Sequence, residues 1–467
     1  MQNEKPTPKD LCDRLTNFCK TYFLIDSRND KQFYYALTDA ELKEFPLAKC
    51  GIFLNLVMDG ELEKAWDVVN SFKGTLVFQF LSLVHPQIAL VDFIKILNEL
   101  KVKSYPNSRV LLTAGRPFLM NGVYDFTPLF PFLLRKKELF IDGISYLYEK
   151  ELAPSIYNLC LAEYYYQKNE LLNAEVFVSK TIKEFDTASQ RRLLFVALYL
   201  QSKILIANGK NISDGGYIKQ IRQFVKEEGE LEFSNNLDAA EAMLAFYDEG
   251  GVNLISSEFL KSKAPDEFAN FSMLDTYSYM VKIRCYIVSK KFTATIALAE
   301  KLRPLLHEGH RQMDLCELDL LLSICFYRSN EKELCFAALE RALKIAKRRG
   351  FYRLVADEGE AIFHILVEYA NEKGESPFLM QVLEMARNMA IHHPLYLKPV
   401  FKKNTTFTNT EMEVLKLLEH GKSKEEISQY LFVSVNTVKF HLKNIYSKLE
   451  SKSAHQAVWE ARVLGVI

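Results

Sequence analysis

The segment from Ser434 to Leu449 has the sequence SVNTVKFHLKNIYSKL. At 100° per residue, its apolar side chains share one narrow arc of a helix. These are Val435, Val438, Leu442, Ile445 and Leu449. The opposite arc carries Asn436, Phe440, Lys443 and Ser447, flanked by Lys439 and Asn444. The pattern predicts a helix from Ser434 to about Leu449, with one face in a core and the other in solvent.

The charge around this segment is one-sided. No Asp or Glu occurs between Glu426 and Glu450, although acids make up 59 of the 467 residues. Three lysines and His441 lie in the same window. An exposed helix face with positive charge and no acid is typical of a surface that approaches nucleic-acid phosphates.

Three further helices are expected around this one. Thr408–Glu411 and Ser423–Glu426 each have the spacing of a capping box, which marks the first turn of a helix. The first helix should bury Met412, Leu415 and Leu418 and stop at Gly421; the second is short and ends at Leu431.

A tight turn is expected at Phe432-Val433, followed by Ser434 as the cap of the third helix. A fourth helix should begin after Ser453 and end at Gly465. A short helix, a tight turn and a longer helix with a positive outer face predict a helix-turn-helix, whose second helix enters a DNA major groove.

Upstream, most of residues 40–390 has helical periodicity interrupted by polar or glycine-containing breaks. These breaks fall at Asn169, Asn208–Gly216, Glu249–Gly251, Lys290–Lys291, Ser329–Asn330 and Asn371–Gly374. Intervals of roughly 40 residues are typical of helical-hairpin repeats. Since one hairpin cannot bury its apolar face alone, stacked neighbours are expected to form a tetratricopeptide-like α-solenoid. The expected fold class is therefore all-α.

Three local features refine this expectation. An earlier hairpin should turn at Asp59-Gly60, and residues 104–128 should be irregular because they contain three prolines and two glycines. The aromatic run Tyr164-Tyr165-Tyr166 is attributed to packing between helices.

The expected domains are a lead-in at 1–40, helical repeats at 41–391, a linker at 392–406 and the helix-turn-helix domain at 407–467. The linker is assigned from Pro394 and Pro399, because helices usually end before such prolines.

Composition narrows the function classes. The 59 Lys and Arg residues balance the 59 acids, which excludes a uniformly basic coat for polyanions. The eight cysteines form no Cys-x-x-Cys pair, which favours buried thiols in a reducing compartment. The amino-terminal residues are polar and no apolar run reaches the roughly 20 residues of a membrane helix. We expect a cytoplasmic protein that contacts no membrane, has no metal, cofactor or catalytic residue, and is not an enzyme.

Residues 407–465 resemble the LuxR-type helix-turn-helix domain of bacterial transcription regulators. The positions that agree are Phe407-Thr408, Glu411, Glu413-Val414-Leu415, Gly421-Lys-Ser423, Glu426-Ile427, Leu431-Phe-Val-Ser434, Thr437-Val438-Lys439, His441, Asn444-Ile445-Tyr446, Lys448-Leu449, Ala457 and Leu464-Gly465. Two positions depart from the family pattern: Glu450 stands where Gly is common, and Ala454 where Arg is frequent.

The resemblance implies roles for individual side chains. Positions matching Lys439, Phe440 and Lys443 contact base edges in this family; Lys can donate to guanine, and an exposed ring can touch a thymine methyl. The alternative for Phe440 is a lone surface aromatic. Phosphate-binding or positioning roles are expected at Lys424, Ser434, Asn436, Thr437 and His441.

The last helix of LuxR-type domains pairs two copies on DNA. The resemblance therefore implies a homodimer with contacts from Val458, Ala461 and Arg462, although internal packing is an equal alternative for Val458.

The segment Ala337–Gly350, with Arg353 and Asp357–Gly359, resembles the helical-repeat arm of the maltose-regulator type of LuxR-family activator. Such regulators usually carry an ATPase domain, which we do not expect here. The Gly-Lys-Ser at Gly421–Ser423 lacks the upstream glycine of a phosphate loop, because Lys416 stands there.

Two functions remain open. One is a transcription regulator that binds double-stranded DNA and whose repeats sense a small ligand or partner protein. The other is an interaction scaffold whose helix-turn-helix does not bind DNA.

Overall fold

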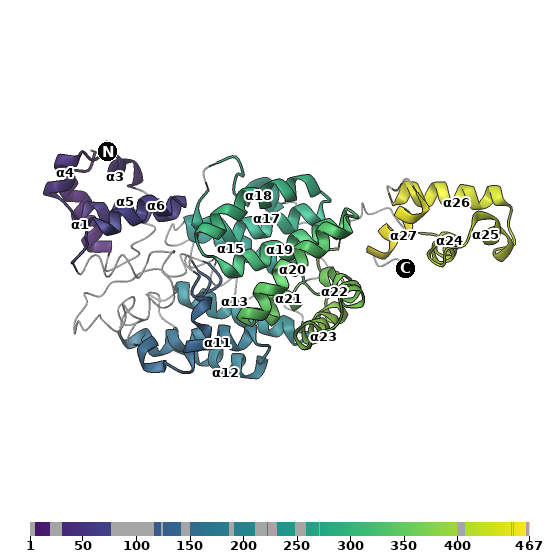
Figure 1. Ribbon diagram of the computed structural model, residues 1–467, viewed down its shortest axis with the longest axis horizontal. Coiled ribbons are helices and arrows are strands. Elements are labelled where there is room, and N and C mark those ends of the chain that lie inside the picture. The colour runs from purple at the N-terminus through teal and green to yellow at the C-terminus, as the bar shows by residue number, and fades with distance from the viewer. Residues whose placement is uncertain are drawn as a thin grey trace. The chain divides into compact units, whose positions relative to one another are not determined.

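The computed structural model describes residues 5–18, 30–75, 116–122, 125–141, 150–185, 191–210, 222, 231–247, 258–269, 271–398, 407–449, 451, 453–463 and 467. Their packing defines two compact units: Met1–Tyr286 with Phe292–Tyr396, and Ile287–Lys291 with Leu397–Ile467. Within the described residues there is no β-strand, only an isolated bridge between Asn121 and Asp125. The predicted all-α fold is confirmed (Figure 1).

The first unit, here called the arm, is a succession of helices (Figure 1). Its first part contains α1 (Pro8–Phe18), α3 (Lys31–Tyr35), α4 (Asp39–Glu44), α5 (Ala48–Asp59), α6 (Leu62–Asn70), η1 (Thr127–Leu129), α9 (Phe130–Leu133), η2 (Lys150–Leu152), α11 (Ala153–Gln167), α12 (Leu171–Glu184) and α13 (Arg191–Ala207). Its second part contains α15 (Leu231–Ala245), η4 (Phe259–Lys263), η5 (Met273–Asp275), α17 (Thr276–Val288), α18 (Phe292–Glu308), α19 (Gln312–Arg328), α20 (Lys332–Arg349), α21 (Tyr352–Ala356), α22 (Gly359–Lys373) and α23 (Pro377–His392).

Helical hairpins recur because single residues reverse the chain in the left-handed region. Asn169 (φ 60°) joins α11 to α12, Lys290 (φ 55°) joins α17 to α18, and Asn330 (φ 64°) joins α19 to α20. Asn tolerates this conformation better than most residues, because its short side chain can hydrogen-bond locally. Consecutive helices pack on each other, so the hairpins stack as a solenoid.

The earlier turn expected at Asp59-Gly60 is also confirmed, since Gly60 (φ 79°) ends α5 before α6 begins. The break expected at Glu249–Gly251 lies outside the described residues. The irregular stretch expected at 104–128 is described from residue 116 onward, apart from 123–124, and its described residues contain only turns, the bridge and part of η1.

The tyrosines of the run at 164–166 pack against other elements, as predicted. Tyr164 meets the ring of Phe130 edge-on at 5.6 Å between centroids, and Tyr165 stacks on Phe177 of α12 at 5.5 Å. Tyr166 is buried and donates to Asp357.

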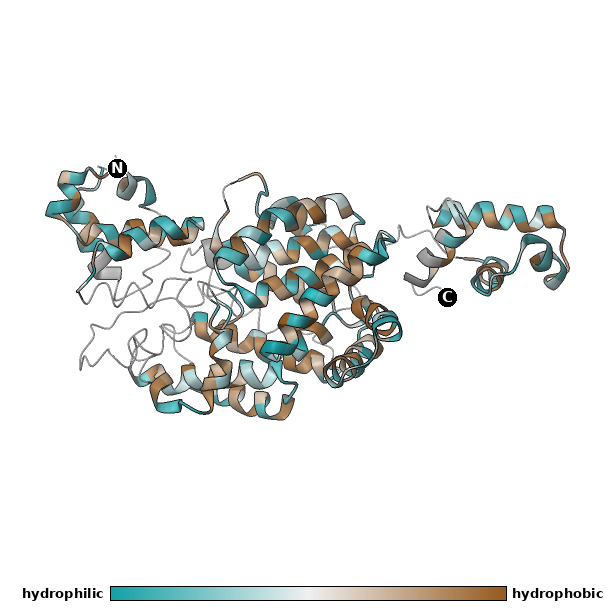
Figure 2. Ribbon diagram, in the orientation of Figure 1, coloured by the Kyte–Doolittle hydropathy of each residue, from teal (hydrophilic) through white to brown (hydrophobic). Residues whose placement is uncertain are grey.

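The second unit contains α24 (Asn409–Glu419), α25 (Lys424–Tyr430), α26 (Val435–Lys448) and α27 (Ala454–Val463). Hydrophobic and hydrophilic residues alternate along α24, α25 and α26 (Figure 2). The buried core consists of Val414, Leu415, Ile427, Val438, Leu442, Ile445, Leu449, Ala457 and Ala461. The burial differs from the sequence prediction at Met412, Leu418 and Val435, which are only half-buried. Val414, which was not predicted to be in the core, is fully buried.

The domain boundaries stay a prediction. The structure places His393 and Tyr396, both in the expected linker, among the buried residues of the first unit. Residues 399–406 lie outside the described part of the chain.

Candidate nucleic-acid interface

Two capping boxes begin the first two helices of the C-terminal unit, as the sequence predicted. The Thr408 and Ser423 N–H groups donate to Glu411 Oε2 and Glu426 Oε2 over 2.7 and 2.8 Å. In return, the Glu411 and Glu426 N–H groups each donate to the capping hydroxyl over 3.2 Å. Both helices therefore begin with orphan donors satisfied.

The turn between α25 and α26 has the tightness expected of a helix-turn-helix. Phe432 adopts φ 53°, and the Val433 N–H donates to the Ser428 carbonyl over 3.0 Å. Ser434 then caps α26, because its Oγ accepts the Thr437 N–H over 3.1 Å. The two hydroxyls of Ser434 and Thr437 lie 2.8 Å apart, so they form one polar group at the start of α26.

The outer face of α26 brings the candidate base-reading residues together. Lys439, Phe440 and Lys443 are all exposed, and 61% of Phe440 is accessible to solvent. Their neighbours Val438 and Leu442 point the other way, into the core. The face exists because core residues recur every three or four positions and leave the intervening positions outward.

The candidate positioning residues occupy two places. Ser434 and Asn436 are exposed at the start of α26, and Thr437 and His441 are half-buried on the same helix. The His441 ring meets Phe440 edge-on at 5.8 Å between centroids. Lys424 is exposed at the first residue of α25, so it stands apart from the others.

Electrostatics distinguish α26 from its neighbours. No acid lies on α26, while the acids of α25 are Glu425 and Glu426 in its first turn. The backbone N–H of Ser423 and the ammonium of Lys422, 3.1 Å away, lower the pKa of Glu426. Glu426 is therefore ionised and bonded to Ser423 and Lys422, the two residues before α25. The outer face of α26 carries lysines and no acid.

Two exposed aromatic side chains were not singled out from the sequence as candidate contacts. Tyr430 at the end of α25 is 69% exposed, and Phe432 in the turn is 95% exposed. Phe432 is itself the left-handed residue of the turn, and Tyr430 ends α25 just before it. Aromatic residues at the tight turn expected at Phe432-Val433 would have been the signal for both.

The three residues expected to form dimer contacts differ in their burial. Val458 is half-buried, while the Arg462 side chain lies outside what the structure describes. The assignment of Ala461 is wrong, because Ala461 is fully buried in the core. The face of α27 that carries Ala457 and Ala461 packs inward, so a partner could not touch either methyl group.

We also searched the described residues for a metal site and for a membrane-spanning helix. They contain no cluster of His, Cys, Asp and Glu that could hold a metal ion. None of their helices is both long enough and apolar enough to cross a membrane.

The capped short helix, the tight turn and the exposed positive face of the next helix define α25–α26 as a helix-turn-helix. Residues 405–461 match the family described as "Bacterial regulatory proteins, luxR family". The C-terminal domain is thus a LuxR-type helix-turn-helix domain.

A longer similarity involves a named transcription regulator. Over 247 residues the chain is 25% identical to the "HTH-type transcriptional regulator MalT" of Klebsiella pneumoniae subsp. pneumoniae. That alignment covers 49% of this chain and 27% of the regulator. The match therefore spans about a quarter of the length of this curated relative.

Proposed function

We propose that the chain is a DNA-binding transcription regulator that acts without enzymatic chemistry. Its LuxR-type domain binds double-stranded DNA, and its arm senses a small ligand or a partner protein. The observation that carries the proposal is the outer face of α26, where Lys439, Phe440 and Lys443 are exposed on a helix without acids.

The proposed contacts follow from groove chemistry. In a major groove, Lys439 and Lys443 donate to guanine O6 and N7, and the Phe440 ring touches a thymine methyl. Ser434, Asn436, Thr437 and His441 contact phosphates near the start of α26, where unpaired backbone N–H groups also favour anions. Lys424 contacts a phosphate from the start of α25.

We further propose that two copies bind one operator. Half-sites about one helical turn apart would place two copies of α26 in successive major grooves. Val458 and Arg462 on α27 remain the candidate contacts between the copies, and Ala461 is removed from that set because it is buried.

The test is selection of binding sites by the full chain from a pool of random duplexes. A regulator enriches one sequence, and Lys439→Ala loses that enrichment. Lys416→Ala is the matched control, because Lys416 is an exposed lysine on α24, outside the helix-turn-helix. Recovery of random DNA, or no DNA at all, would instead favour the interaction scaffold.

A further inference from the structure

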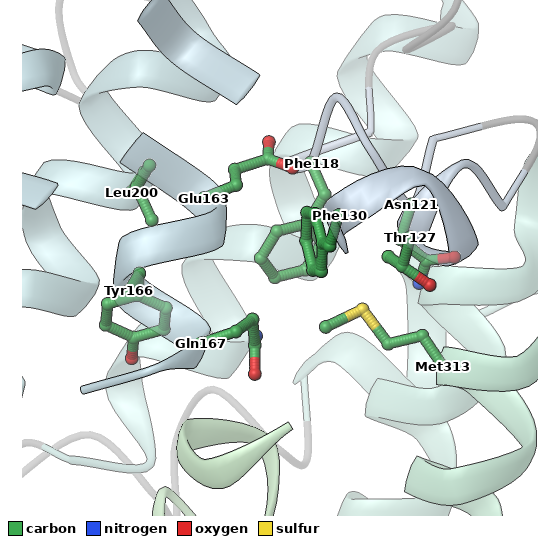
Figure 3. A pocket seen from close by; sticks show the side chains of 9 residues that line it. All are labelled: Phe118, Asn121, Thr127, Phe130, Glu163, Tyr166, Gln167, Leu200 and Met313. Carbon is green, nitrogen blue, oxygen red and sulfur yellow. The ribbon is translucent and has the colours of Figure 1, made fainter. Parts of the chain in front are cut away.

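The cavity of the arm that Figure 3 shows has room for about one water molecule, so it admits no larger ligand. Gln167 of α11 and Met313 of α19 point into it (Figure 3). Their neighbours along the chain, Lys168 and Gln312, meet the end of α20 at the surface of the arm. Several cations gather at that end of the helix.

Five cations from three parts of the arm make up this group, which we call the basic patch: Arg135, Lys168, Lys347, Arg348 and Arg349. The last three form the final turn of α20. Arg135, Lys347 and Arg348 are exposed, whereas Lys168 and Arg349 are half-buried. The basic patch therefore presents long charged side chains to solvent above two cations that are partly enclosed by protein.

Lys168 reaches this place from the end of α11. Its Nζ fills the space where a Cβ on Gly350, the C-cap of α20, would lie. The same ammonium group lies 6.0 Å from the ring centroid of Tyr164 and 5.6 Å from that of Tyr352. Lys168 is therefore beside the residue that directly follows Arg349.

Arg135 reaches the same place from the end of α9. Burial raises the pKa of Tyr164, and the charge of Arg135 opposes that shift, so Arg135 lies near the Tyr164 hydroxyl. Phe130, the first residue of α9, meets the rings of Tyr164 and Phe351 edge-on at 5.6 and 6.4 Å. The short helix α9 is therefore a neighbour of the end of α20.

The protein does not neutralise the basic patch with carboxylates. None of its five cations forms an ion pair in the part of the chain that the structure describes. Arg348 donates to the amide oxygen of Gln312 over 2.9 Å, and Arg349 Nε is buried without a hydrogen-bond partner. The charges of the basic patch are thus available to an anion from outside.

Positive charge at the two half-buried positions is costly. Burial lowers the pKa of Lys168, and the charge of Glu170 opposes this only in part. Burial and the neighbouring charge of Arg348 lower the pKa of Arg349, against the effect of Asp125. A bound anion would offset this cost, because an opposite charge nearby favours the ionised form.

The first turn of α20 differs from its last. Lys332 is exposed there and pairs with Glu372 over 2.5 Å. Cations in the last turn of a helix are commonly explained by the helix dipole. That explanation does not extend to Lys168 and Arg135, which belong to other elements, so the basic patch is more than the charged end of one helix.

We propose that the basic patch binds the phosphates of double-stranded DNA. The inference rests on the proposed function, which brings a duplex to this chain through the C-terminal unit. DNA suits the basic patch better than an acidic protein does, because the cores of protein interfaces are poor in charge and rich in aromatic side chains. Here the rings of Tyr164 and Tyr352 are half-buried beside Lys168. Phosphate contacts add affinity without reading sequence.

The experiment measures the affinity of the full chain for the selected site and for random duplex DNA at several salt concentrations. Each phosphate contact contributes about 0.9 to the slope of log affinity against log salt concentration. Joint replacement Lys347→Ala and Arg348→Ala should therefore reduce that slope by about two and weaken binding to both DNAs alike. Both side chains are exposed and Ala favours helix, so the variant should fold.

Two further variants make the result specific. Arg135→Ala, on a different element, should reduce the slope by about one. Lys332→Ala is the matched control, because this exposed lysine of α20 already has Glu372 as its partner, and the slope should not change. The proposal is overturned if neither patch variant changes the slope. It is also overturned if the patch variants weaken binding of poly-glutamate but not of DNA, which would assign the basic patch to an acidic protein.

This inference and the proposed function fail in different ways. If the native chain selects one sequence and the patch variants keep its salt slope, the basic patch is wrong and the proposed function stands. If the patch variants reduce the slope but the native chain selects no sequence, the basic patch stands and the proposed function fails. A native chain that binds no DNA overturns both.

Discussion

The hydroxyl of Tyr396 donates to Glu358 Oε2 over 2.8 Å inside the arm, 1% of Tyr396 being exposed. Arg284 Nε donates to the same hydroxyl oxygen over 3.2 Å and pairs with both Glu358 and Glu317. Beside this group, Asp357 pairs with Arg353 and with Lys203. Arg284, Arg353 and Lys203 thus pair with Glu317, Asp357 and Glu358 in one buried cluster, which joins α13, α17, α19 and α21.

We predict that Tyr396→Phe lowers the free energy of unfolding of the arm by about 1–3 kcal/mol, because it leaves buried partners unsatisfied. In the native chain the Tyr396 ring stacks on Tyr247 at 4.6 Å. A Phe ring can keep this contact, so only the hydroxyl is lost. Urea unfolding measures the change. Tyr327→Phe is the control, since it removes a 2.8 Å bond to Glu368 at the surface and should cost far less. If both variants lose the same free energy of unfolding, the buried Tyr396 hydroxyl contributes no more than the surface hydroxyl of Tyr327.

A second prediction concerns the pH dependence of the C-terminal domain. Glu411 is buried and accepts from Lys448 over 2.5 Å and from the Thr408 N–H. Burial raises the pKa of Glu411, but the bonds from Lys448 and Thr408 outweigh it, and the net pKa is lowered from 4.5. A lowered folded pKa adds stability above the unfolded pKa, and this stability disappears as pH falls below about 4.5.

The measurement compares the native chain with Glu411→Gln. At pH 7 the variant should be less stable by about 1–3 kcal/mol, because Lys448 loses its charged partner. Hydrogen exchange of α24 amides, taken at matched pH, reports the difference. The difference should shrink as pH falls towards 3, and a constant gap across that range would contradict the assignment.

The third prediction is that residues 400–467 fold alone into the four-helix domain. The reason is that α24–α27 share one core, and three of these helices carry side-chain caps. Dispersed amide signals in an NMR spectrum are expected. Ser434→Ala should destabilise the fragment by about 1 kcal/mol through loss of the cap. A collapsed spectrum for the unsubstituted fragment would refute the prediction.

What the sequence could predict is set by the range of the interactions. The boxes at Thr408 and Ser423 and the turns at Asn169 and Asn330 depend on residues within one helical turn, so their patterns were sufficient. The Leu119 and Met120 N–H groups donate to the buried Glu163 carboxylate, and the Tyr396 hydroxyl donates to Glu358. These contacts join distant parts of the chain. No periodicity encodes those contacts.

The same distinction explains the assignments on α27 and α26. The resemblance predicts Ala461 as a dimer contact, but it does not specify which face of α27 packs inward. The core occupies the face that carries Ala461. On α26 the apolar arc itself settled the orientation, so the exposed positions of Lys439, Phe440 and Lys443 followed from periodicity. Their contacts with DNA stay a prediction.

That last prediction separates base contacts from phosphate contacts. If Lys439 and Lys443 reach base edges, replacing either with Ala should cost roughly 1–3 kcal/mol on the selected site and relax the preference at one position per half-site. Phe440→Ala should weaken discrimination of a thymine more than it weakens overall affinity. Lys424→Ala should instead weaken binding to all DNA sequences alike and reduce the slope of log affinity against log salt concentration by about one.

Binding isotherms on the selected site and on random DNA, at several salt concentrations, distinguish these behaviours. Equal losses on both DNAs for Lys439→Ala and Lys443→Ala would mean that these lysines only neutralise phosphates. Unchanged binding for both would mean that α26 is not in the groove, and the scaffold function would then be the better explanation of the fold.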